Sequence, residues 1–153
     1  SRWLVRTIGS FGRVQFIAND ELERGLVAAH GAAMIDELDL IQNGPGEGVH
    51  WRQRAQDLID NSTLVVFDLS VYSPGVVWEV AHVEKTIGFE MCLVLFEHGS
   101  GPAFERYLQE FPALKGSIAE RTTPVVELGR GWFGRLRLTM ALFDWTRRLQ
   151  GIA

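Results

Sequence analysis

Short apolar runs rich in β-branched residues alternate along the chain with segments in which apolar residues recur every three to four positions. The clearest apolar runs are TLVVFDL, at residues 63–69, and MCLVLF, at residues 91–96. Because almost every position in them is apolar, they are typical of central parallel strands covered on both faces. The alternation predicts an α/β domain with a mainly parallel sheet of about five strands, a flavodoxin-like three-layer sandwich.

The remaining elements follow from periodicity and from turn residues. Either of two segments can supply the first strand, 3–8 or 13–18, and the other expected strands cover 36–41 and 124–128. The expected helices run from Asn19 or Asp20 to about 33, and over 51–60, 74–87, 103–111 and about 131–150. Residues 98–102 are expected to form a loop, and Pro112 is expected to end the fourth helix.

The expected C-terminal helix carries apolar residues on two faces. One stripe consists of Trp132, Leu136, Met140 and Phe143, and the other of Leu138, Leu142, Trp145 and Leu149. One stripe should pack on the sheet, because a surface helix normally buries a single apolar face. The other stripe either finds a second partner within the chain or mediates self-association.

The composition of the chain bears on its domain count, its partners and its compartment. The chain has 153 residues, 46% of them hydrophobic, which fits a single domain over 1–153 with a substantial core. A net charge of -4 gives no electrostatic footprint for nucleic acid. No run is long and apolar enough for a membrane helix. The lone Cys92 favours a reducing compartment, so a cytoplasmic location is expected. Starting at Ser1 suggests a processed chain or a domain excised from a longer protein.

The sequence lacks the motifs of several common kinds of functional site. His30, His50, His82 and His98 show no metal-ligand spacing, so no metal is expected. There is no GxSxG elbow, and Cys92 lies within an expected strand, where a nucleophile is inaccessible. Residues 44–48, GPGEG, are either a flexible turn or a wall of a phosphate pocket.

A glutamate near the start of the helix at 74–87 is the main candidate for chemistry. Ser73 and Pro74 form a strong helix start, and on a helical wheel Glu79 lies at the edge of the apolar stripe. The helix follows the strand at 63–69, so Glu79 should lie near the carboxyl end of that strand, where open α/β sheets bind ligands. Asp68 also lies at this end of the strand. Either Glu79 pairs with an arginine at the surface, or the two carboxylates form a ligand site.

Residues 51–97 resemble nucleoside 2-deoxyribosyltransferase-like proteins and TIR-like domains. In both families a helix leads to a strand, then to a loop and a helix bearing a glutamate, then to another apolar strand. The resemblance implies that Glu79 is the catalytic carboxylate, acting at the anomeric carbon of a ribosyl group. In deoxyribosyltransferases the glutamate also follows a glycine by a few residues, as Glu79 follows Gly75.

The resemblance also implies the reaction and the residues around the substrate. The expected function is cleavage of an N-ribosyl bond, most of all hydrolysis of NAD by a TIR-like domain in signalling or defence. The expected substrate contacts are Asp68, Ser70, Tyr72, Ser73, Gly75, Trp78, His50 and Trp51. No cofactor is required, because NAD or a nucleotide is the substrate. Ser73 stands where deoxyribosyltransferases carry an acidic residue, so nucleoside transfer and a non-catalytic nucleotide-sensing or interaction module remain the alternatives.

Overall fold

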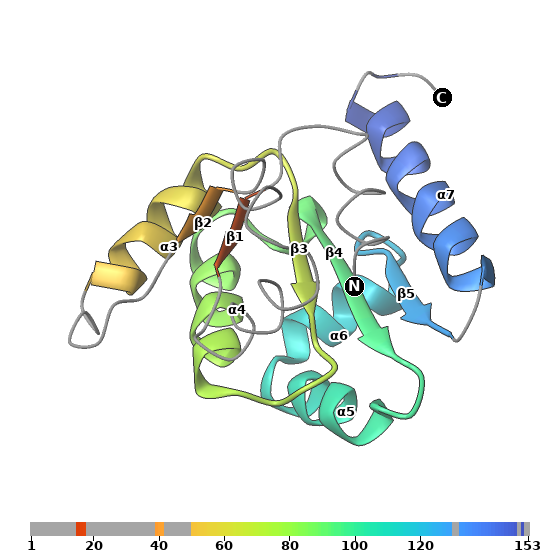
Figure 1. The fold of residues 1–153 in the computed structure, drawn as a ribbon, viewed down its shortest axis with the longest axis horizontal. Coiled ribbons are helices and arrows are strands. Elements are labelled where there is room, and N and C mark those ends of the chain that lie inside the picture. The colour runs from red at the N-terminus through yellow and green to blue at the C-terminus, as the bar shows by residue number, and fades with distance from the viewer. Residues whose placement is uncertain (1–14, 18–38, 42–49, 130–131, 150, 152–153) are drawn as a thin grey trace. The chain divides into compact units, whose positions relative to one another are not determined.

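A computed structural model of the chain describes residues 15–17, 39–41, 50–129, 132–149 and 151 (Figure 1). The chain divides into two compact units, residues 1–58 and 59–153. In the first unit, strands β1 (Gln15–Ile17) and β2 (Asp39–Ile41) pair in parallel, with Phe16 opposite Leu40. Both lie inside expected strands. The strand expected at 3–8, the helix expected after Asn19 or Asp20, and the loop at 44–48 all lie outside the described residues.

Three parallel strands form the sheet of the second unit, in the order β3–β4–β5. They are β3 (Val65–Asp68), β4 (Cys92–Glu97) and β5 (Val125–Leu128). The central strand is β4, and its first four residues are buried, as its unbroken apolar sequence predicts. The expectation of an α/β architecture with parallel strands is therefore confirmed for this unit.

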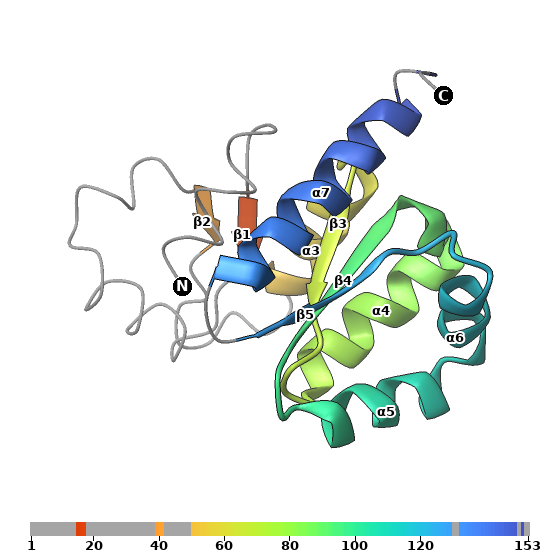
Figure 2. The same cartoon turned by 90° about the vertical axis from the view of Figure 1, so that its right-hand side faces the viewer.

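Along the described part of the chain, helices alternate with the strands. The helices are α3 (His50–Asp60), α4 (Pro74–Thr86), α5 (Gly101–Glu110), α6 (Pro112–Ala119) and α7 (Trp132–Leu149), with a short 3-10 helix η2 (Phe89–Met91). Figure 2 shows α7 on one side of the β3–β4–β5 sheet and α4, α5 and α6 on the other. None of the helices in the described part of the chain is long and apolar enough to cross a membrane.

The region around Pro112 corrects the sequence-based expectation. Pro112 was expected to end the preceding helix, but it also begins α6, an eight-residue helix that was not predicted. Proline is well tolerated in the first turn of a helix, because an amide there has no helical acceptor in any case. Helix α5 also begins at Gly101, inside the segment 98–102 that was expected to be a loop.

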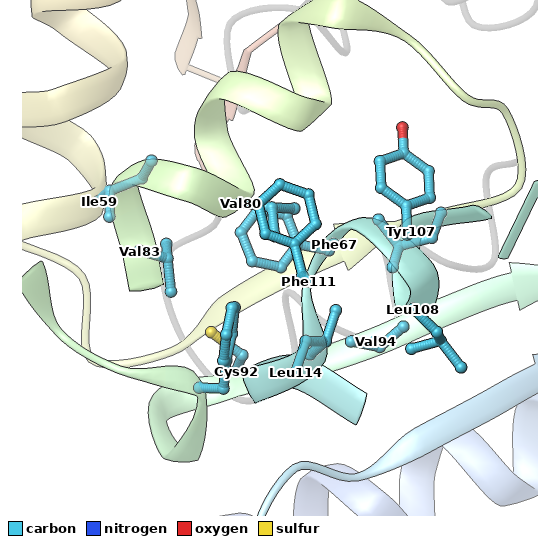
Figure 3. Packing of buried hydrophobic residues seen from close by; sticks show 12 residues of the cluster. Ile59, Phe67, Val80, Val83, Cys92, Val94, Tyr107, Leu108, Phe111 and Leu114 are labelled. Atoms are coloured by element: carbon cyan, nitrogen blue, oxygen red, sulfur yellow. The ribbon is translucent and has the colours of Figure 1, made fainter. Parts of the chain in front are cut away.

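The main core of the second unit lies between the sheet and the helices α4, α5 and α6 (Figure 3). Val80 and Val83 project from α4 and Tyr107 from α5, and all three are fully buried. They pack in one cluster with Phe67 of β3 and Val94 of β4. This packing fixes one face of α4 against the sheet, and with it the position of the neighbouring Glu79.

Gly116 of α6 and Gly134 of α7 differ in the space around them, so substitutions there can test how closely each helix packs. An added Cβ at Gly116 of α6 would meet nothing within 4 Å, whereas at Gly134 of α7 it would lie 3.2 Å from the Gly129 nitrogen. We expect Gly116→Ala to raise the free energy of unfolding by about 0.5–1 kcal/mol, because alanine favours the helix. Gly134→Ala should not stabilise the protein in this way, because its Cβ would approach backbone atoms of Gly129, which cannot move aside easily. Equal stabilisation in urea unfolding would contradict the close packing of α7.

Candidate functional site

Glu79 lies in the second turn of α4, beyond the loop that leaves the carboxyl end of β3. The Ser73 hydroxyl caps the helix by accepting a hydrogen bond from the Val76 amide, at 3.3 Å. Pro74 occupies the first turn, as the sequence predicts. The start of α4 is therefore fixed locally, and the position of Glu79 along the helix follows from it.

The carboxyl group of Glu79 is largely removed from water. Burial raises its pKa from 4.5 to about 7, because a charged carboxylate loses its hydration there. Among the described residues no cation and no hydrogen-bond donor pairs with this carboxyl group. The surface ion pair that was the alternative interpretation is therefore not seen within this part of the chain.

An unpaired buried carboxyl group with a pKa near 7 has a definite chemical capacity. At neutral pH its protonated and ionised forms are both well populated, so it can accept or donate a proton. Its ionised form also attracts a developing positive charge strongly, because few water dipoles screen it. Glu79 is thus suited to acid–base chemistry or to stabilising a cationic transition state.

Tyr107 of α5 holds the loop that leads into α4. Its hydroxyl donates to the Val71 carbonyl oxygen at 3.0 Å and accepts from the Ser73 amide at 3.0 Å. Burial is the main reason that the pKa of Tyr107 lies above its usual value, and the negative field of Glu79 contributes. Tyr107 therefore lies within electrostatic range of Glu79. No local pattern singles out this residue, because it lies 28 positions after Glu79, within an ordinary amphipathic helix.

Tyr72 was expected to stack on a base. In the structure its ring and hydroxyl contact side chains of α5. The Arg106 guanidinium lies 3.7 Å from the centre of its ring, and the ring of Tyr107 is 4.9 Å away. The Tyr72 hydroxyl donates to the carboxylate of Glu110, which is the largest cause of its raised pKa. Helix α5 thus brings two unpredicted charged residues, Arg106 and Glu110, to this loop.

Asp68 and Ser70 join the ends of β3 and β4. One carboxylate oxygen of Asp68 accepts hydrogen bonds from the Ser70 amide, at 3.0 Å, and from the Ser70 hydroxyl. The same hydroxyl accepts from the Glu97 amide at 2.9 Å. The Ser70 hydroxyl therefore both donates and accepts within the protein. A ribose hydroxyl would have to compete with these bonds, as it would with the capping bond of Ser73.

The other expected contacts lie on α4 and at the start of α3. Trp78 stacks on His82 one turn later, with 5.6 Å between ring centres, and His82 Nε2 lies 2.9 Å from Asp60 Oδ1. Gly75 lies in the first turn of α4. His50 and Trp51 begin α3 in the first unit, and their side chains lie outside the described part of the structure. Tyr72, Ser73, Gly75, Trp78 and Glu79 therefore share one continuous segment.

The described residues offer neither a metal-binding cluster nor a reactive thiol. No group of three or more His, Cys, Asp or Glu side chains within the described ranges could hold a metal ion. Cys92 is buried in β4, as expected, and its burial raises the pKa of the thiol to about 12. The thiol is therefore protonated and unreactive near neutral pH.

Comparison with known proteins adds no relative. No family model matches the chain, and no curated protein or solved structure matches it. The resemblance to deoxyribosyltransferase-like and TIR-like domains stays a prediction. The environment of Glu79 is therefore the feature that indicates a functional site.

Proposed function

We propose that the chain cleaves an N-ribosyl bond, with NAD as the substrate and nicotinamide as the leaving group. One observation carries the proposal: the Glu79 carboxyl group is largely buried and has no ionic partner among the described residues. Maintaining such a group is unfavourable for folding, and perturbed carboxyl groups of this kind are concentrated at functional sites.

The chemistry of the substrate suits such a group. The bond between C1′ of the ribose and the ring nitrogen breaks with its electron pair going to nicotinamide, which leaves as a neutral base. Positive charge then develops on the ribosyl ring, and the Glu79 carboxylate stabilises it in surroundings of low dielectric constant. Water adds to C1′ and releases one proton, so the products are nicotinamide, ADP-ribose and a proton.

Ionised Glu79 is the active form in this scheme. The nicotinamide ring of bound NAD is itself cationic, so its approach should lower the pKa of Glu79 and favour the carboxylate. No metal or further cofactor takes part. The proposal keeps the expected substrate contacts of the second unit, which are Asp68, Ser70, Tyr72, Ser73, Gly75 and Trp78, and His50 and Trp51 stay sequence-based expectations. It also keeps the five-stranded flavodoxin-like fold and a cytoplasmic role in signalling or defence.

A direct test is to incubate the protein with NAD and to follow both products. We expect nicotinamide and ADP-ribose to appear in equal amounts, at a rate proportional to the protein concentration. Formation of ADP-ribose as the single adenine-containing product would locate the cleavage at the nicotinamide bond. Absence of nicotinamide at about 100 μM protein, over hours, would count against turnover of NAD by this chain.

A nucleotide-sensing module without turnover is the second candidate. It is favoured by the hydrogen bonds that already engage the hydroxyls of Ser70 and Ser73, and by the Arg106 guanidinium over the Tyr72 ring. Nucleoside transfer also remains an alternative. A nucleotide that raises the melting temperature while releasing no base would favour the sensing module. Release of free base only when an acceptor base is present would favour transfer.

A further inference from the structure

One face of α7 carries large apolar side chains that the second unit does not cover. Each is between 45% and 63% exposed, and together they are Trp132, Phe133, Leu136, Met140 and Phe143. We call this set the α7 stripe. The rings of Trp132 and Phe133 also stack on each other, with 4.0 Å between their centres.

The opposite face of α7 already packs on the sheet. Leu138 and Leu142 are buried there, and Gly134 allows the helix backbone to approach Gly129 at the end of β5. Of the two apolar stripes that the sequence contains, this one supplies the sheet contact. The α7 stripe therefore has no role in the described core of the unit.

We propose that the α7 stripe is the contact surface for a second copy of this chain. The area is sufficient. With roughly half of each large side chain exposed, the stripe presents about 500–600 Å², which is at the upper end of apolar patches on monomers. Two such surfaces would bury about 1,000–1,200 Å² in total, which lies just below the range of stable interfaces and within that of weak, transient ones. A reversible dimer is therefore expected.

The spacing within the stripe suits a helix of the same sequence. Phe133, Leu136, Met140 and Phe143 follow one another at intervals of three, four and three residues. This is the repeat by which two helices interlock their side chains along a seam. Arg137 and Asp144 lie on one side of the seam and carry opposite charges, and Arg147 occupies the next position of the same repeat.

Sedimentation of the full chain across a concentration series tests the proposal. We expect a monomer–dimer equilibrium that is predominantly dimeric at about 1 mM. The variant Met140→Glu/Phe143→Glu should raise the dissociation constant at least about a hundredfold, because it places like charges within the seam. Both side chains are more than half exposed, so the variant should keep the melting temperature of the monomer.

The control is Arg148→Gln, an exposed position on another side of the same helix. It should dimerise as the unmodified chain does. A chain that is strictly monomeric at about 1 mM would overturn the proposal, because the α7 stripe would then not bind a second copy. A dimer that persists in the double variant would also overturn it, since the interface would then lie elsewhere.

Discussion

Replacing Glu79 by glutamine is expected to lower the rate of nicotinamide release by about a hundred- to a thousandfold, the usual effect of removing one electrostatic group that stabilises a transition state. Glutamine has nearly the same size, so the packing beside Val80 and Val83 should be preserved. Its amide carries no charge and cannot take up a proton at neutral pH. The variant therefore removes the chemistry while keeping the shape.

Glu84 provides a matched control for this experiment. It lies on the same helix, in an exposed position, so Glu84→Gln makes the same chemical change in contact with water. This variant should retain the activity of the unmodified protein. If Glu79→Gln keeps more than about a tenth of the activity, Glu79 is not the group that stabilises the transition state.

The same substitution should stabilise the protein at alkaline pH. The pKa of Glu79 is raised from 4.5 to about 7 in the folded state. Below pH 4.5 both the folded and the unfolded chain are protonated at this position, so no penalty exists. Between pH 4.5 and 7 the unfolded chain loses this proton while the folded chain retains it, and unfolding becomes more favourable. Above pH 7 the loss of stability is complete, at about 3 kcal/mol.

Urea unfolding at a series of pH values measures this effect. The quantity of interest is the free energy of unfolding of Glu79→Gln minus that of the unmodified chain. It should increase by about 3 kcal/mol between pH 4 and pH 8. A difference that does not vary with pH for Glu79→Gln would contradict a buried, unpaired carboxyl group.

Much of the second unit could be predicted from the sequence, because its strongest signals are local. Continuous apolar runs indicate β3 and β4, and Ser73 with Pro74 indicates the start of α4 to the residue. The helical wheel predicts that Glu79 lies at the edge of the apolar stripe, and the structure confirms this position, because the side chain is partly exposed and partly buried. Here the period of the helix and its cap determine the environment of the side chain.

Other features depend on contacts between distant segments, which local patterns do not encode. Tyr107, Arg106 and Glu110 reach the loop before α4 only because α5 packs beside it. The wheel for α7 showed two apolar stripes but could not choose between them, since the choice depends on which face meets β5. Pro112 gives an ambiguous local signal, because proline can both end one helix and begin the next, as it does here.

The state of the Glu79 carboxyl group can be measured by carbon NMR on protein with labelled glutamate, with Glu79→Gln used to assign its resonance. A titration should give Glu79 a pKa of about 7, well above the ordinary range for glutamate. A pKa near 4.5 would mean that water or a cation reaches the group, and it would contradict the buried, unpaired carboxyl group on which the proposed activity rests.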